Sequence, residues 1–275
     1  MSRHLHIDAF SGIAGDMFLG ALIDLGADPK EIQRRLQNLP VEKPWSLKID
    51  RVSRHAIGAI DLKVLTENAH EHHHHVHNHD HAHSHVHKHE HSHHHHHTNY
   101  HDIMHMIDHL ETTDRGKSRA KRVVTLLAES EAKVHQTTLD KIHFHEVGAV
   151  DSIVDMLGSI VAVEMLEIES FSCGPLPISR GFVKCDHGRM PIPAPATAYL
   201  LEGTLTIGVD RVGELITPTG AALVKGLCES FGPQPGMVIE NIGYGAGDRE
   251  DELIPNLLRL FIGELSSPKR LMPTV

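Results

Sequence analysis

The residues best suited to chemistry in this chain are eighteen histidines within residues 70–97, which alternate with other residues throughout 77–91. Imidazole titrates near neutral pH and offers a nitrogen lone pair that suits zinc, copper, iron and nickel. The tract is internal and is interrupted by other polar residues, which argues against an expression tag. We therefore interpret it as a segment that collects a divalent transition metal. The predicted ligands in it are His72, His73, His74, His75, His77, His79, His81, His83, His85, His87, His89, His91, His93, His94, His95, His96 and His97.

A solvated or pH-sensing linker is the alternative interpretation of this histidine tract. The segment has no apolar periodicity, so we expect it to be disordered without metal. Metal binding requires neutral imidazole, whose ordinary pKa is about 6.5, so metal loading should weaken as the pH falls through that value. Such a segment predicts several exchangeable sites, which favour metal transfer over storage in one rigid cage.

A second group of candidate metal ligands lies within residues 143–155. In a strand, two histidines at alternate positions point to the same face, and two aspartates four residues apart share one face of a helix. Nitrogen and carboxylate ligands together suit a five- or six-coordinate divalent ion more than a structural thiolate site. The alternative is a set of hydrogen-bonded histidines and a helix cap. The predicted ligands are His143, His145, Glu146, Asp151 and Asp155, with His135 as a further ligand or as a partner that orients one.

Three loops rich in glycine or threonine, at 8–16, 217–220 and 243–249, predict an anionic, phosphate-bearing ligand. Glycines after a strand let backbone N–H groups approach a phosphate, and a helix N-terminus favours negative charge. Each loop alone is equally consistent with a structural turn, and the first lacks the lysine of a P-loop. The aspartates of the first loop would repel a bare phosphate, so a bridging cation is expected there. The predicted substrate-binding residues are Asp8, Gly12, Gly15, Asp16, Thr217, Thr219, Gly245 and Gly247.

Three alternating prolines between Pro191 and Pro195 exclude a regular helix from the segment that begins at His187. We expect an extended arm there that positions His187 and Arg189, followed by a helix.

Composition excludes several classes of partner. The 275 residues carry a net charge of −10 at pH 7, which argues against nucleic acid. The longest nearly apolar stretch, 153–163, contains Asp155, so no membrane span is expected. The first residues lack the apolar core of a signal peptide, and the three cysteines lack CxxC spacing. These features predict a cytoplasmic protein.

The hydrophobic pattern predicts strands interleaved with helices. Expected strands are 5–10, 46–52, 57–66 and 142–146, with further short strands after Ser170. Expected helices are 17–25, 29–39, 101–112, 117–135, 150–166, 194–202 and 217–230, and a glycine loop is expected at 243–247. This order predicts an α/β or α+β fold with a mixed sheet and flanking helices. We expect one globular domain made of 1–66 and 100–265, a disordered histidine-rich insertion at 67–99 and a tail at 266–275.

Taken together, these segments resemble the LarC family of nickel-insertion proteins. The resemblance covers nearly all of residues 5–263, and several of the matching strings are long enough to be specific. The strings are DAFSGIAGDM at 8–17, the histidine tract, VH at 134–135, HFHEVGAVDSIVD at 143–155, HGRMPIPAPAT at 187–197, TPTGAA at 217–222 and GYGAG at 243–247.

The resemblance implies a nickel insertase, a lyase of the metal chelatase or cyclometallase type. It would insert Ni²⁺ into pyridinium-3,5-bisthiocarboxylic acid mononucleotide, forming carbon–nickel and sulfur–nickel bonds of the nickel-pincer cofactor used by lactate racemase. Forming the carbon–nickel bond requires loss of a ring proton, and we expect His187 to be the catalytic base.

The resemblance also implies CTP with a divalent metal, bound through a C-terminal LarC portion. We expect this chain to need that portion for activity. The expected partners are the mononucleotide precursor, the C-terminal portion and the apo-racemase.

Two other functions compete with nickel insertion. One is a nickel- or zinc-buffering metallochaperone whose globular part is only a scaffold. The other is a metal-dependent phosphohydrolase that uses the aspartates with His143 and His145, which explains the histidine tract poorly.

Overall fold

The computed structural model describes residues 3–41, 44–66, 98–142, 144, 148–185, 188–249 and 251–266. Its strands are β1 (Arg3–Asp8), β2 (Trp45–Arg54), β3 (Ile57–Thr66), β4 (Ile168–Cys173), β5 (Leu176–Arg180), β6 (Phe182–Cys185), β7 (Gly188–Pro191), β8 (Thr206–Val212), β9 (Ser230–Phe231), β10 (Met237–Ala246) and β11 (Leu257–Leu265). Its helices are α1 (Gly15–Asp24), α2 (Pro29–Leu36), α3 (Tyr100–His109), α4 (Asp114–Val134), α5 (Val150–Met165), α6 (Pro195–Leu200) and α7 (Pro218–Leu227), with a 3₁₀ turn, η1, at Leu139–Lys141.

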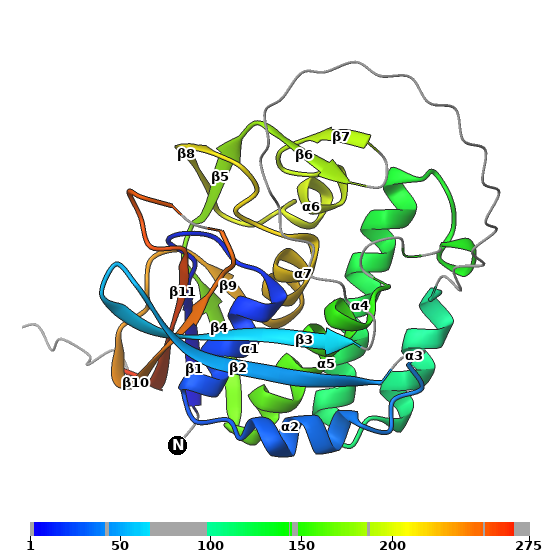
Figure 1. The fold of residues 1–275 in the computed structure, drawn as a ribbon, viewed down its shortest axis with the longest axis horizontal. Helices are drawn as coiled ribbons and strands as arrows, with labels where there is room; N and C mark the ends of the chain where they lie inside the picture. The colour runs from blue at the N-terminus through cyan, green and yellow to red at the C-terminus, as the bar shows by residue number, and fades with distance from the viewer. Residues whose placement is uncertain are drawn as a thin grey trace, which may run out of the picture.

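Among the described residues, seven strands form the main sheet in the order β2-β3-β10-β11-β1-β4-β9 (Figure 1). Strand β1 runs parallel to β4 and antiparallel to β11, and β10 runs parallel to β3. Two smaller pairs, β5 with β8 and β6 with β7, accompany the main sheet. The sheet is therefore mixed and flanked by helices, which confirms the predicted fold class.

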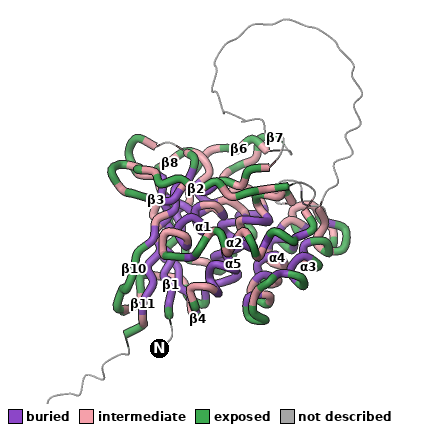
Figure 2. Tube along the Cα trace, turned by 60° about the horizontal axis from the view of Figure 1, so that its bottom comes forward, coloured by how far each residue is buried: buried purple, intermediate pink, exposed green. Residues whose placement is uncertain are grey.

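One face of the main sheet is covered by helix α1, which packs on β3, β10 and β11. Helix α5 packs against α1 and β3, and α2 and α4 pack on α5. Leu5 and Ile7 of β1 are fully buried, while His4 and His6 alternate with them and point to the opposite face. Figure 2 shows the buried segments concentrated along β1, α1 and α5, whereas much of β8 and β10 is exposed.

Several helices begin where the sequence signals predict. The side chain of Asp28 accepts a hydrogen bond from the N–H of Lys30 (2.9 Å) just before α2, whose first residue is Pro29. Thr113 caps α4 by accepting from the N–H of Gly116 (2.9 Å). The expected helices at 29–39, 117–135 and 150–166 are confirmed to within a few residues. None of the helices in the described part of the chain combines the length and apolar character needed to cross a bilayer.

Two predictions about local structure are wrong. The glycine loop expected at 243–247 is largely the end of strand β10. The strand expected at 142–146 is absent from its described residues, because Ile142 and Phe144 follow η1 and belong to no strand. Both side chains are buried, and the N–H of Phe144 donates to the carbonyl of Thr98 (3.3 Å). The apolar alternation here therefore anchors a connecting loop to the core.

Candidate functional site

The candidate site lies where the segment after β1 pairs with the segment before α7. The N–H of Ile13 donates to the carbonyl of Leu215 (2.8 Å), and the N–H of Thr217 donates to the carbonyl of Ile13 (3.1 Å). Ile13 and Ile216 form a parallel bridge. Segments 11–16 and 213–219 therefore run side by side beyond the carboxyl end of β1, which is where sheets of this kind commonly bind ligands.

Two glycines permit this pairing. A Cβ on Gly12 would lie 2.0 Å from the carbonyl oxygen of Leu215, and one on Gly220 would lie 2.4 Å from that of Ile13. Gly12 also has a φ of +113°, which favours glycine. The structure thus gives Gly12 a packing role, and its role in substrate binding stays a prediction.

Gly15 faces the side chain of Asp155 on α5 and the hydroxyl of Thr219 in α7. A Cβ on Gly15 would lie 2.8 Å from Asp155 Cβ and 3.3 Å from Thr219 Oγ1. Asp155 Oδ1 is buried and has no hydrogen-bond partner among the described residues. Since an unpaired buried carboxylate oxygen is costly, this atom marks a place where a proton, a cation or a ligand should bind.

The carboxyl groups of Asp16 and Asp155 resist ionisation. Burial, together with the negative charges of Asp248 and Asp61, raises the pKa of Asp16 to about 7, against the lowering effect of the hydrogen bond from the N–H of Met17. Burial also raises the pKa of Asp155 well above its usual range, with additional effects from Asp16 and Asp151. Like charges and low polarity both disfavour the charged form. A divalent cation would offset these costs by replacing the protons.

The two aspartates of α5 lie one helical turn apart, as predicted. Asp151 is exposed in the first turn, where its Oδ1 accepts from the N–H of Ser152 (2.8 Å), and Asp155 is half-buried. Together with Asp16 they form an acidic series that leads from the surface to the junction of α1, α5 and α7.

Thr217 and Thr219 belong to the same junction. Thr217 caps α7, because its Oγ1 accepts from the N–H of Gly220 (3.2 Å), and its hydroxyl lies 2.9 Å from that of Thr219. Thr219 is buried and faces Gly15 and Asp155. The helix cap therefore brings hydroxyl oxygens close to the acidic pair.

Three of the predicted substrate-binding residues have structural contacts of their own. Asp8 ends β1 and is ion-paired with Arg259, whose Nη2 and Nε lie 2.5 and 2.9 Å from its Oδ2. A Cβ on Gly245 would lie 1.8 Å from the carbonyl oxygen of Met17, and one on Gly247 would lie 2.6 Å from Asn256 Nδ2. Gly245 thus lets β10 approach α1, the helix that carries Asp16.

The remaining predicted ligands and the predicted base lie outside the described residues; they are the histidine tract at 70–97, His143, His145, Glu146 and His187. In the part of the chain that is described, no three histidine, cysteine, aspartate or glutamate side chains converge as a metal site. A metal at Asp155 and Asp16 therefore needs further ligands from those segments or from a substrate. His135 lies at the end of α4, with its Nε2 3.7 Å from Glu131 Oε2.

A group of polar residues near Ser11 was not predicted as a unit. Arg211 contacts both Ser11 and Asp251, and Arg249 lies beside the same carboxylate. These residues come from three separate segments, around positions 11, 211 and 249–251, so no single motif in the sequence contains them all. The loops predicted at 8–16 and 243–249 contain Ser11 and Arg249, but nothing in the sequence indicated Arg211 or Asp251.

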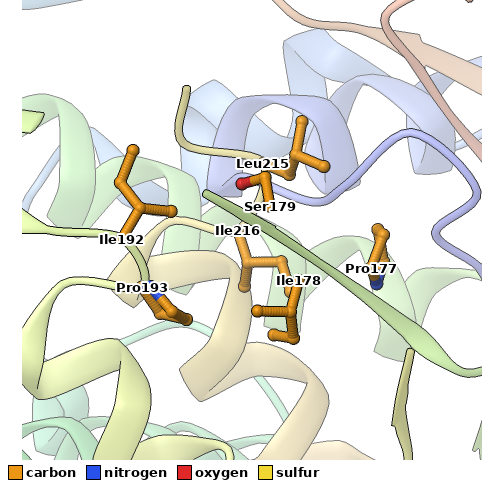
Figure 3. A pocket seen from close by; sticks show the side chains of 7 residues that line it. All are labelled: Pro177, Ile178, Ser179, Ile192, Pro193, Leu215 and Ile216. Atoms are coloured by element: carbon orange, nitrogen blue, oxygen red, sulfur yellow. The ribbon is translucent and has the colours of Figure 1, made fainter. Parts of the chain in front are cut away.

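A small cleft of about 10 Å³, room for about one water molecule, opens beside Leu215 and Ile216 (Figure 3). Its other lining residues are Pro177, Ile178, Ser179, Ile192 and Pro193. Ligand pockets usually measure about 300–1,000 Å³, so this cleft is too small for a mononucleotide. We therefore do not assign the candidate site to it.

Comparison with known proteins adds independent information. The nickel insertion protein family matches residues 5–272. A pyridinium-3,5-bisthiocarboxylic acid mononucleotide nickel insertion protein of Staphylococcus epidermidis is 39% identical over 260 residues, which cover 94% of this chain and 59% of that protein. A protein of Geobacter sulfurreducens is 43% identical over 264 residues, 95% of this chain and 61% of its own length. The chain thus spans about 60% of the length of these relatives. No solved structure matches it.

Proposed function

The chain belongs to the nickel insertion protein family, and we propose that it binds Ni²⁺ and takes part in inserting it into pyridinium-3,5-bisthiocarboxylic acid mononucleotide. The product would be the nickel-pincer cofactor used by lactate racemase. One observation in the fold supports this proposal most directly. It is Oδ1 of Asp155, which has no hydrogen-bond partner in the described part of the chain and lies near Asp16 where helices α1, α5 and α7 meet.

Nickel would reach this junction in two stages. Imidazoles of the tract at 70–97 would collect the ion and pass it to His143 and His145, which precede α5 in the sequence. Asp151 is exposed at the start of α5, and Asp155 lies one turn further along the helix. The acidic series thus offers oxygen ligands leading away from the histidines. A bound divalent ion would displace the protons that burial holds on Asp16 and Asp155.

Ligand preference gives the transfer its direction. The sulfur atoms of the precursor are softer ligands than imidazole or carboxylate, so nickel should leave the protein for the small molecule. The carbon–nickel bond forms with the electron pair of a ring C–H bond, whose proton passes to a base. We propose His187 as that base, because imidazole has a pKa near the working pH.

The relatives extend well beyond the length of this chain. We propose that their additional C-terminal portion supplies the CTP-dependent step and its divalent metal, and we assign no step of this chain to CTP. Insertion would then require both portions.

The test is a mixture of this chain, Ni²⁺, CTP, the precursor and the C-terminal portion of a longer relative. Mass spectrometry of the small molecule should detect nickel in the complete mixture and should not detect it when either protein portion is omitted. Asp155→Asn should abolish the product, and Asp114→Asn, on the exposed first turn of α4, should not. A nickel-free small molecule in the complete mixture would show that the proposal is wrong.

The density of histidines also supports a second function, a nickel or zinc buffer without catalysis. Deleting residues 70–97 separates the two. A buffer should lose its metal capacity and its function together. An insertase should keep its turnover when nickel is saturating, because the tract only supplies the ion.

A further inference from the structure

Two arginines from distant parts of the chain meet at one carboxylate near Ser11. Arg211, in β8, donates from Nη2 to Asp251 Oδ2 (2.6 Å) and from Nη1 to Ser11 Oγ (3.1 Å). Arg249, which follows β10, has its Nη2 3.9 Å from the same oxygen of Asp251. Two guanidinium groups therefore share a single carboxylate.

Asp251 is already committed to other partners. Its Oδ2 accepts from Arg211, and its Oδ1 accepts from the N–H groups of Leu253 (3.0 Å) and Ile254 (3.2 Å). The hydrogen bond from Arg211 and those from the two N–H groups lower the pKa of Asp251 to about 2. Asp251 thus neutralises Arg211 and holds its own loop, and among the described residues it gives Arg249 only the longer ion pair of 3.9 Å.

Arg249 is short of hydrogen-bond acceptors. Its Nε and Nη2 atoms are buried and have no hydrogen-bond partner among the described residues, and the 3.9 Å to Asp251 is too long for a hydrogen bond. Its Nη1 makes a long contact of 3.5 Å with the carbonyl of Glu214. Burial lowers the pKa of Arg249, and the nearby charge of Arg211 lowers it further. The side chain as a whole is 30% exposed, through atoms other than Nε and Nη2.

We propose that Arg249 and Arg211, with the hydroxyl of Ser11, bind a phosphate monoester, the 5′-phosphate of the mononucleotide. Guanidinium groups bind phosphate through pairs of N–H donors, which are the groups that Arg249 leaves unused. Ser11 Oγ accepts from Arg211, so its own O–H can donate to a phosphate oxygen. The identity of this ligand rests on the proposed function, whereas the anion site itself does not.

The position of this cluster fits a ligand that is anionic at one end and metal-binding at the other. Ser11 contacts Arg211, and Gly15 faces Asp155. These two residues lie four positions apart, so at most about 14 Å of chain separates them. The facing segment runs from Gly213, whose Cβ would lie 3.3 Å from Arg249 Nη1, to Thr219 beside Asp155. In a mononucleotide the ribose separates the phosphate from the ring. The phosphate would lie at the two arginines, and the substituents of the ring would lie near Asp16 and Asp155.

Binding of a simpler pyridinium mononucleotide tests the assignment. Isothermal titration of the full chain with nicotinic acid mononucleotide and with nicotinic acid riboside measures how much the phosphate contributes. The mononucleotide should bind at least about 10-fold more tightly than the riboside. Arg249→Gln should remove this preference while leaving riboside binding unchanged, and Arg249→Lys should restore part of it. Arg180→Gln is the matched control, because Arg180 forms an exposed ion pair with Asp210.

The outcomes separate this site from the nickel chemistry. No preference for the phosphorylated ligand in the unmodified chain, or a preference that survives Arg249→Gln, would overturn the assignment. Titration with inorganic phosphate alone should also show binding that Arg249→Gln removes; unchanged phosphate binding would count against the site. If the phosphate preference depends on Arg249 but no nickel enters the dithio precursor, the anion site stands and the proposed function fails.

Discussion

Helix α5 carries one buried and one half-buried carboxylate side chain, in opposite surroundings. Glu164, near the end of the helix, accepts hydrogen bonds from Thr113 Oγ1 (2.5 Å) and Arg119 Nη1 (2.5 Å), and Arg115 Nε lies 3.2 Å away. Its side chain is 2% exposed. Both of its oxygens therefore accept hydrogen bonds.

Asp155, near the beginning of the same helix, lacks such partners. Its Oδ1 is unpaired among the described residues, and the charges that affect its pKa are the acidic side chains of Asp16 and Asp151. Among the described residues, two arginines compensate Glu164, whereas no basic side chain compensates Asp155. The comparison indicates that Glu164 stabilises the packing of α4 on α5, whereas Asp155 is available for a cation that the described fold does not supply.

The largest effect is expected at Glu164. Glu164→Ala should lower the free energy of unfolding by about 3–5 kcal/mol, because it leaves the mostly buried guanidinium of Arg119 without its carboxylate. Urea unfolding measures the loss, and nickel affinity per folded molecule should not change. Glu129→Ala, at an exposed position of α4, should change the free energy of unfolding by less than about 0.5 kcal/mol. If Glu164→Ala lowered the free energy of unfolding no more than Glu129→Ala does, the contrast between Glu164 and Asp155 would be lost.

Asp155→Asn should have the opposite pattern. Nickel affinity should fall about 100-fold, since a neutral amide is a much weaker ligand, while the melting temperature should not fall. Calorimetric titration with Ni²⁺ is best done in a chain lacking 70–97, so that the tract does not mask the site. Asp114→Asn is the matched control on α4. If Asp155→Asn destabilised the protein and left nickel affinity intact, Asp155 would be a structural residue like Glu164.

A third buried polar group tests whether complete hydrogen bonding marks a structural role. Ser172 Oγ lies 2.7 Å from His4 Nε2 and 2.8 Å from His6 Nδ1. Burial lowers the pKa of both histidines, which favours the neutral form of each ring. Ser172→Ala should cost about 2 kcal/mol of unfolding free energy by leaving ring nitrogens unpaired, and it should not affect nickel binding. Ser118→Ala, at an exposed position of α4, is the control for side-chain removal. Reduced nickel affinity in Ser172→Ala would contradict this interpretation.

Local signals predicted the elements and part of the site. Asp28 before Pro29 marked the start of α2, and the four-residue spacing of Asp151 and Asp155 placed both on one face of α5. These features depend on residues close in the chain, where capping and helical periodicity decide the structure. The mixed sheet followed from the interleaving of strands and helices.

The junction itself could not be predicted, because it depends on contacts between distant segments. Nothing in the sequence indicates that Ile13 pairs with Ile216, or that Arg211 reaches Ser11. The glycines at 243–247 were interpreted as a flexible ligand loop, since glycine serves equally in turns and in close packing. Only the tertiary structure shows that Gly245 faces the backbone of Met17.

The smallest expected effect is the pH dependence of stability at Asp16. Its pKa is about 7 in the folded protein and 3.8 ordinarily, so between these values the unfolded chain has lost a proton that the folded protein keeps. Stability should therefore fall as the pH rises through this interval and stay lower above pH 7. Asn at this position does not titrate and can still accept the hydrogen bond from the N–H of Met17 (2.8 Å). Asp16→Asn should thus be the more stable protein at pH 8, and its advantage should shrink by about 1.4 kcal/mol per pH unit below pH 7.

Urea unfolding at pH 6 and pH 8, with a chelator present, measures this difference. His4 and His6 have lowered pKa values, so they make the folded protein less stable as the pH falls through 6.5. The unmodified chain and Asp16→Asn share this effect, so it cancels in their difference. If the stability advantage of Asp16→Asn grew as the pH was lowered, the direction of pH dependence assigned to Asp16 would be wrong. Added Ni²⁺ should reverse the order of stability at pH 8 and make the unmodified chain more stable than Asp16→Asn, because a ligand stabilises most the folded protein that binds it most tightly. That reversal would separate Asp16 and Asp155 from Glu164, whose compensating charges are already in place.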